Sequence, residues 1–208
     1  KTMMIGVRNH SGDVKSGEVW VNELRLKEHN NKGGWAANAN LNIQLSDFGS
    51  VNATGRYVSE GFGGLEDGVA SRSTDNYGTY SVTTSLEMGK FFPDKAKVSI
   101  PVYYSVTKEK TSPKYNPMDT DMELKDALDA AGSKTERDSI ENIAVTKVTQ
   151  TNFSVSNARV GIATKRHPMP YDPANFSFTY SHAHQHTTGE TTVREQRDNW
   201  RGALDYSW

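Results

Sequence analysis

The sequence predicts an all-β protein built from long antiparallel strands, and three observations lead to that prediction. First, every odd position from 37 to 45 is apolar, and every even position from 38 to 46 carries an uncharged polar side chain. Successive side chains of a strand point to opposite faces, so this segment is a strand with one apolar and one polar side. Second, the same alternation recurs along the chain, and third, turn-forming residues separate the repeats.

Further segments share this alternation or its composition and are predicted to be strands. Pro101 lies inside one of them, and because proline has no backbone N–H we expect a bulge or a break there. The polar residues 187–199 are predicted to form a connection and not a strand. The predicted strands are residues 51–57, 79–89, 96–107, 152–156, 176–181 and 200–208.

Two regions are predicted along the chain. Residues 1–26 hold two short strand-like runs, at 3–7 and 18–26, which are typical of the last hairpin of a sandwich-like module. Residues 27–208 hold the antiparallel strands, with a long loop at residues 108–149. The helical spacing of Leu124 and Leu128 predicts a short helix inside that loop, and a second helix is expected from Ser133 onward.

Composition excludes several classes of protein. Apolar residues make up 35% of the 208 residues, and no segment approaches the roughly 20 apolar residues of a membrane helix. A membrane β-barrel stays open, because its alternating strands average to a hydrophilic sequence. The formal net charge of -1 gives no general electrostatic footprint for nucleic acid, so no nucleic-acid partner is expected.

The spacing of the strands favours a segment of the wall of an antiparallel transmembrane β-barrel with long loops. Short and long connections alternate, and aromatic residues such as Trp35, Phe48 and Tyr57 collect near strand ends, as they do in outer-membrane barrels. Strands of ten residues or more favour the membrane form. The alternative is a soluble β-rich binding module, with Trp20 and Trp35 available to bind a carbohydrate.

If the strands cross a membrane, the two sides of each strand have different surroundings. Uncharged polar side chains are then candidates for the pore-facing side: Asn38, Asn40, Asn42, Gln44, Thr79, Ser81, Thr83 and Ser85. The apolar positions are candidates for the lipid-facing side: Ala39, Leu41, Ile43, Leu45, Tyr80, Val82, Leu86, Val98, Ile100 and Val102.

No pattern in the sequence points to catalysis, and we expect no enzymatic activity and no cofactor. The glycines at residues 61–64 lack the Lys-Ser/Thr that completes a phosphate-binding loop, and no nucleophile elbow occurs. Alternate positions on a strand would place His182, His184 and His186 on one face, and histidine is a common metal ligand. Because no acidic or fourth ligand is fixed nearby, we interpret them as a hydrated strand end.

Several strings in the chain resemble one family, the SprA/Sov family, the giant outer-membrane translocon of the Bacteroidetes type 9 secretion system, which is linked to gliding motility. The resemblance is clearest from residue 17 to about residue 121 and is thinner beyond. It rests on GEVWVNELRL at residues 17–26, KGGWAANA at 32–39, LSDFG at 45–49, GFG at 61–63, LEMGKFFP at 86–93 and KYNPMD at 114–119.

The resemblance implies that this chain is a fragment of one very large barrel that exports folded cargo proteins across the bacterial outer membrane. It also implies that the barrel has a lateral opening. The partners that it implies are a plug protein, a PorV-type companion barrel and the lipid bilayer. The family has no catalytic motif, so no role passes to an individual residue. A fragment of this length is not expected to close such a barrel by itself.

Overall fold

The computed structural model describes residues 5–21, 33–68, 71–161 and 169–208. The chain divides into two compact units, residues 1–32 and residues 33–208. None of the described helices is both long enough and apolar enough to cross a membrane.

The first unit carries no strand in its described part. Residues 5–21 are exposed throughout, and the indole Nε1 of Trp20 donates a hydrogen bond to Glu18 Oε2 at 3.2 Å. The predicted strands at residues 3–7 and 18–26 are therefore not formed over residues 5–7 and 18–21, and no described strand supplies the backbone hydrogen bonds that a strand needs there. The rest of the predicted hairpin lies outside the described residues.

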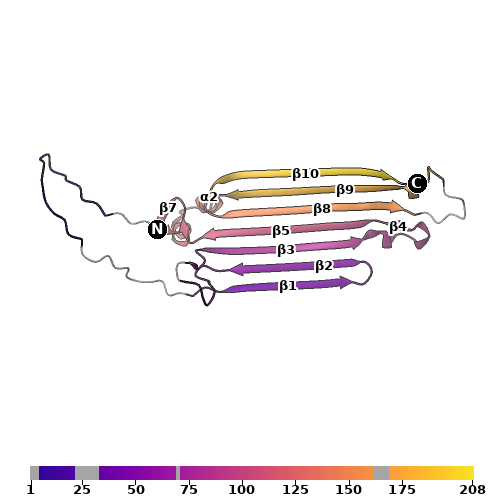
Figure 1. Ribbon diagram of the computed structural model, residues 1–208, viewed down its shortest axis with the longest axis horizontal. Coiled ribbons are helices and arrows are strands. Elements are labelled where there is room, and N and C mark those ends of the chain that lie inside the picture. The colour runs from indigo at the N-terminus through magenta and orange to yellow at the C-terminus, as the bar shows by residue number, and fades with distance from the viewer. Residues whose placement is uncertain (1–4, 22–32, 69–70, 162–168) are drawn as a thin grey trace. The chain divides into compact units, whose positions relative to one another are not determined.

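The second unit is built on an eight-stranded antiparallel sheet in the order β1-β2-β3-β5-β8-β9-β10, with the short β4 paired to β8. Figure 1 shows the long strands lying side by side. Their bounds are Ala36–Leu45 (β1), Gly49–Val58 (β2), Asp75–Glu87 (β3), Val98–Ser99 (β4), Pro101–Pro113 (β5), Thr146–Val160 (β8), Phe176–Gly189 (β9) and Thr192–Tyr206 (β10).

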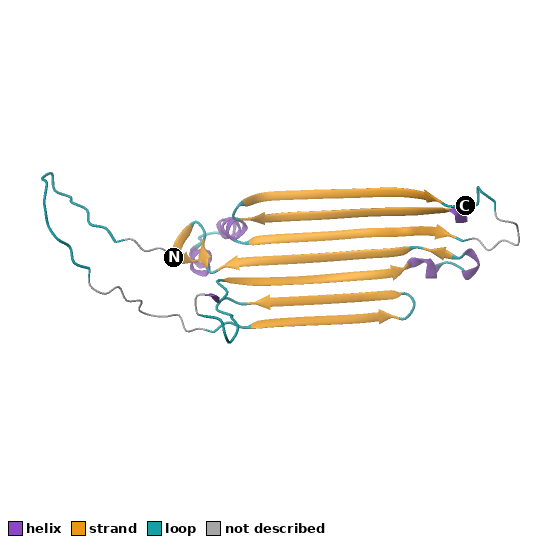
Figure 2. Ribbon diagram, viewed as in Figure 1, coloured by secondary structure: helices purple, strands orange, loops and turns teal. Residues whose placement is uncertain are grey.

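The two ends of the sheet carry different connections. One end, which we call the turn end, has the tight turn at residues 46–48 and the 3-10 helices η2 (Met88–Phe91) and η3 (Asp94–Ala96). The other, the loop end, has the connections at residues 59–74 and 114–145. Figure 2 shows the two longer helices at the loop end.

Two predicted connections are shorter than expected, because the strands continue into them. β5 runs to Pro113 and β8 begins at Thr146, so the loop predicted at residues 108–149 covers only 114–145. Most of the connection predicted at residues 187–199 is strand, and β9 turns into β10 within two residues. These extensions carry polar side chains on both faces, which hides the alternation that identifies a strand.

The long connection between β5 and β8 folds on itself. It contains the paired strands β6 (Tyr115–Asn116) and β7 (Asp119–Glu123), then the helices α1 (Leu124–Ala130) and α2 (Lys134–Ala144). Ser133 caps α2 by accepting a hydrogen bond from the Glu136 N–H at 3.2 Å. The buried side chains of Leu124, Ala144 and Val145 form a small core, against which Leu128 and Ile140 pack. Both helices lie inside the loop in which the sequence predicts them.

The chain breaks its strand just before Pro101, as the missing N–H predicts. Ile100 belongs to no strand, while Val98 pairs with Val160 of β8 instead of continuing β5. The carboxylate of Glu87 closes the break by accepting hydrogen bonds from the Ile100 N–H at 2.6 Å and the Gly89 N–H at 3.1 Å. The expectation that Ile100 continues a row of strand residues is therefore wrong.

The contact between α2 and the sheet gives a prediction about acid. Lys110 of β5 and Lys147 of β8 lie opposite each other, and both contact Glu141 Oε1, at 3.0 and 3.2 Å. The hydrogen bond from Lys110, aided by that from Lys147, holds the pKa of Glu141 below its ordinary value against the opposing effect of partial burial. The contact therefore stabilises the fold above the pKa of glutamate in the unfolded chain, and this stabilisation is lost as the pH falls through the lower, folded pKa.

A spin label on α2 measures this loss. The chain contains no cysteine, so Asp138→Cys on the exposed side of α2 gives a single labelling site. We expect the label to be immobilised at pH 7 and to become mobile as the pH falls below the ordinary pKa of glutamate and through the lower pKa that Glu141 has in the folded chain. Adding Glu141→Gln should make it mobile already at pH 7, whereas adding Glu136→Gln should not. An unchanged pH profile in the Glu141→Gln variant contradicts the assignment.

Candidate functional site

The pairing register gives the sheet two chemically distinct faces. Residues directly opposite each other on antiparallel strands point to the same side, so the register extends each strand's alternation across the sheet. The face that carries Asn42, the polar face, continues from Asn42 to Asn52 of β2, Thr83 of β3 and Ser105 of β5. The side that carries Leu41, the apolar face, continues from Leu41 to Ala53, Val82 and Val106.

Short neutral side chains that bond to each other cover the middle of the polar face. Ser81 and Thr107 share a hydrogen bond at 2.9 Å, and the Asn152 amide donates to Ser105 Oγ at 3.2 Å. Ser105 is only 6% exposed. Across the middle of the sheet, from β1 to β8, the residues in line with Asn42 are asparagine, threonine and serine, so this surface binds water without presenting a formal charge.

Large apolar side chains stand on the other face without cover. Leu41 is 57% exposed and Ile43 is 42% exposed. Leu45 shares its row with Leu86, Val102 and, further along the same register, apolar residues of β8 and β9. Contiguous exposed apolar surface of this extent indicates contact with a partner or with lipid.

The boundary of the apolar face crosses the strands obliquely. At the loop end, the last apolar residue on this face is Ala37 on β1 but Trp200 on β10. Residues that pair with one another across the sheet form a row, and successive rows on one face are two residues apart. The register places Trp200 in the row of Ile43, which is six residues, or three rows, from Ala37 along β1. Strands rise about 3.4 Å per residue, so the boundary shifts by about 20 Å along the strand direction between β1 and β10. Across the sheet these two strands are six spacings of about 4.8 Å apart. The boundary is inclined by about 35° to the line perpendicular to the strands.

Aromatic residues follow this oblique boundary. Each is the last large apolar residue of its strand on that face before polar or glycine positions follow: Tyr57, Tyr80, Phe153, Tyr180 and Trp200. The rings of Phe153 and Tyr180 lie 6.3 Å apart, and that of Tyr57 lies 4.6 Å from Trp35.

The register separates the two sets of candidate residues that the sequence singles out. All eight polar candidates, from Asn38 to Ser85, lie on the polar face. The apolar candidates on β1, β3 and β5 lie on the apolar face, and Val98 joins it through its pairing with β8. Ile100 belongs to no strand, so the register assigns it to neither face.

The three histidines lie together on the apolar face of β9, beyond its boundary. His184 Nδ1 is 2.6 Å from Asp198 Oδ1, and His182 Nε2 is 3.5 Å from the same oxygen. This carboxylate could not be predicted, because Asp198 falls in the segment predicted to be a loop and comes close only through the pairing of β9 with β10. Among the described residues, no three histidine or carboxylate side chains are placed to hold a metal ion.

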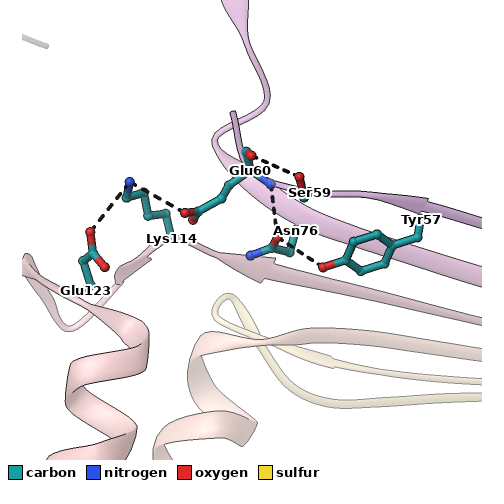
Figure 3. A network of polar contacts seen from close by, with 6 residues as sticks. All are labelled: Tyr57, Ser59, Glu60, Asn76, Lys114 and Glu123. Atoms are coloured by element: carbon teal, nitrogen blue, oxygen red, sulfur yellow. Dashed lines mark hydrogen bonds and ion pairs between the residues drawn. The ribbon is translucent and has the colours of Figure 1, made fainter. Parts of the chain in front are cut away.

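A polar network ties the two long connections together at the loop end (Figure 3). Lys114 Nζ lies 3.7 Å from both Glu60 Oε1 and Glu123 Oε1, and its side chain is only 16% exposed. Asn76 Oδ1 accepts hydrogen bonds from the Glu60 N–H at 3.0 Å and the Tyr57 hydroxyl at 3.4 Å. The network fixes where the connections begin and end relative to the strands. Spacing in the sequence does not reveal it, because its members come from three separate segments.

Asn76 offers a direct test of this network. Replacing it by alanine removes the acceptor for the Glu60 N–H, whereas Asn76→Asp keeps an acceptor oxygen in place. We expect Asn76→Ala to lower the free energy of unfolding by about 1 kcal/mol, as for a typical lost hydrogen bond, and Asn76→Asp to change it by less. Denaturant unfolding of the three proteins measures the difference. Equal losses in both variants would show that the acceptor is not what matters.

Comparison with known proteins adds a family. No curated protein matches the chain. A family model for the SprA N-terminal region, described as motility related/secretion protein, matches residues 1–128, which is more than half of the chain. The match includes β1, β2, β3 and β5 and ends inside α1. The chain therefore belongs to the SprA family of motility related and secretion proteins.

Proposed function

We propose that this chain forms part of the wall of a protein-conducting β-barrel in the bacterial outer membrane, which exports folded proteins in type 9 secretion. In this proposal the apolar face contacts lipid and the polar face lines the water-filled conduit. The observation that carries it is that one sheet has two unlike faces: exposed leucine and isoleucine lie on one side, and neutral amides and hydroxyls lie along the middle of the other. A barrel wall needs both surfaces on the same strands.

The oblique boundary supports the membrane orientation. Strands of outer-membrane barrels tilt by about 35–45° from the barrel axis, so a membrane surface cuts a sheet of such strands at the same angle. The inclination of about 35° found from the register agrees with that tilt. Aromatic residues along the boundary match the interfacial girdles of these barrels. A soluble sandwich has no reason to shift its apolar boundary by three rows between one edge of the sheet and the other.

The neutral middle of the polar face suits the passage of a folded protein. There, from β1 to β8, a lining of asparagine, serine and threonine stays hydrated without a formal charge, so it has little to trap a charged cargo surface. Charged residues of this face, such as Arg56 at the loop end and Arg201 on the edge strand β10, lie outside this middle region. We propose a structural and not a catalytic role for these residues. The secreted cargo, a plug protein and a PorV-type companion barrel are the partners that follow from the family resemblance, and β1 and β10 offer edges for further wall strands.

The alternative, a soluble β-rich binding module that binds a carbohydrate through aromatic side chains, is less well supported. It needs a second layer over the apolar face, where Leu41 is 57% exposed. Trp35, one of the two tryptophans that suggested such a site, lies against Tyr57 with ring centroids 4.6 Å apart.

Spin labels at neighbouring positions test the orientation of the wall. We expect a label at Leu41→Cys, in the full-length protein in a bilayer, to be relaxed mainly by lipid-soluble oxygen. A label at Asn42→Cys should be relaxed mainly by a water-soluble nickel chelate, because adjacent strand residues face opposite sides. Equal exposure of both labels to lipid would refute the wall.

Arginine at adjacent positions of β3 gives a second, functional test. Val82 lies on the apolar face and Thr83 on the polar face. Arginine on the lipid side near mid-membrane costs about 2–4 kcal/mol, so Val82→Arg should reduce the amount of protein assembled in the outer membrane. Thr83→Arg should assemble normally, and the added charge should slow secretion. The amounts of membrane-assembled protein and of secreted cargo measure both effects, and the opposite ranking in assembly would contradict the assignment of the faces.

A further inference from the structure

A hollow lies on the apolar face where that face meets its loop-end boundary. It has a volume of about 970 Å³, and its lining includes Ala39, Gly55, Gly78, Tyr57, Tyr80 and Lys108. Two consecutive rows of the register form it. In one row Tyr57 stands opposite Gly78, and in the next Gly55 stands opposite Tyr80. Each glycine leaves space beside a tyrosine ring, so the hollow has a low, apolar floor between two aromatic walls.

Three lysines of β5 and β8 border this hollow. The same two rows continue to Lys110 and Lys147, which face each other, and to Lys108 beside Tyr80. Lysines directly opposite on a sheet repel each other, and Glu141 compensates by contacting Lys110 and Lys147. Glu141 is the only carboxylate among the described residues that contacts these lysines, so the group keeps a net formal charge of two.

Lys108 is the lysine of the three that no carboxylate pairs with among the described residues. Its Nζ lies 6.0 Å from the centroid of the Tyr80 ring, above the edge of the hollow. The sheet therefore presents a free ammonium group, two partly compensated ones and two tyrosines around an apolar depression. This chemistry complements an amphiphile with an anionic head and hydrocarbon chains.

We propose that this hollow binds one lipid with a phosphorylated headgroup, its phosphate at Lys108 and its neighbours, and the start of its acyl chains on the floor of Ala39 and Gly55. The proposal rests on the proposed function, because the apolar face must contact lipid for a membrane lipid to reach the hollow. Charge complementarity selects the phosphate, and the apolar floor, which continues into the row of Leu41, selects a lipid over a free anion. Tyr57 and Tyr80 lie where a headgroup meets the acyl region, which suits their amphipathic rings.

The test uses the full-length protein in lipid nanodiscs and diphosphoryl lipid A as the probe. We expect Lys108→Gln to weaken its binding about tenfold, the loss of one charge-assisted contact. The matched control is Lys95→Gln, the same loss of charge at the turn end of the sheet, where Lys95 is exposed in η3; binding should change less than twofold. Monophosphoryl lipid A should bind the unchanged protein more weakly, and Lys108→Gln should reduce that preference for the second phosphate.

Two outcomes overturn the proposal. Equal binding of diphosphoryl lipid A by the unchanged protein and Lys108→Gln excludes the hollow as its site. Full competition by millimolar inorganic phosphate shows that a free anion, and not a lipid, is the ligand. A spin label at Leu41→Cys in the same nanodiscs separates this failure from failure of the wall: a label in contact with lipid leaves the wall intact, whereas a label in water refutes the orientation itself.

Discussion

The backbone register is the constraint on which the rest of the structure depends. Because strand side chains alternate with a period of two, slipping one strand by a single residue would move its apolar side chains to the polar face. The pairing from β1 to β10 avoids this: Leu41, Val82 and Val106 remain on one side, and Asn42, Thr83 and Ser105 on the other. Where the register shifts, between Val155 and Ala158, the shift still leaves aromatic residues of β9 on the apolar face.

The sequence predicts strands well where the two faces differ, and poorly where they do not. β1 and β3 carry apolar residues on one side only, so their alternation identifies both the strands and their faces. At the loop end, β9 and β10 are polar on both sides, so their sequences show no alternation of polarity. They nevertheless pair there, for example Gln185 with Arg197. Hydrogen bonding to neighbouring strands, which no local pattern records, is what extends these strands.

The candidate site follows the same rule. The two faces of β1 and β3 could be predicted, whereas the contacts made by Asp198, Lys114 and Lys108 could not. Each of these residues meets its partners across strands or connections, so its role depends on the register between segments far apart in the sequence. The break at Pro101 was predictable for the opposite reason: the missing N–H is a property of the residue itself. Its effect on Ile100 required the pairing of β4 with β8.

The loop end combines features that destabilise the sheet with contacts that compensate for them. Placing Lys110 opposite Lys147 destabilises the sheet, and glycines at positions 55 and 78 weaken its strands. Glu141 relieves the first cost and, in doing so, holds α2 against the sheet. The tyrosines opposite the two glycines, Tyr80 and Tyr57, offset part of the weakening that the glycines cause. Lys108 has no such compensation from a carboxylate within the described residues, and a ligand that supplied negative charge there would stabilise the end of the sheet at which both helices lie.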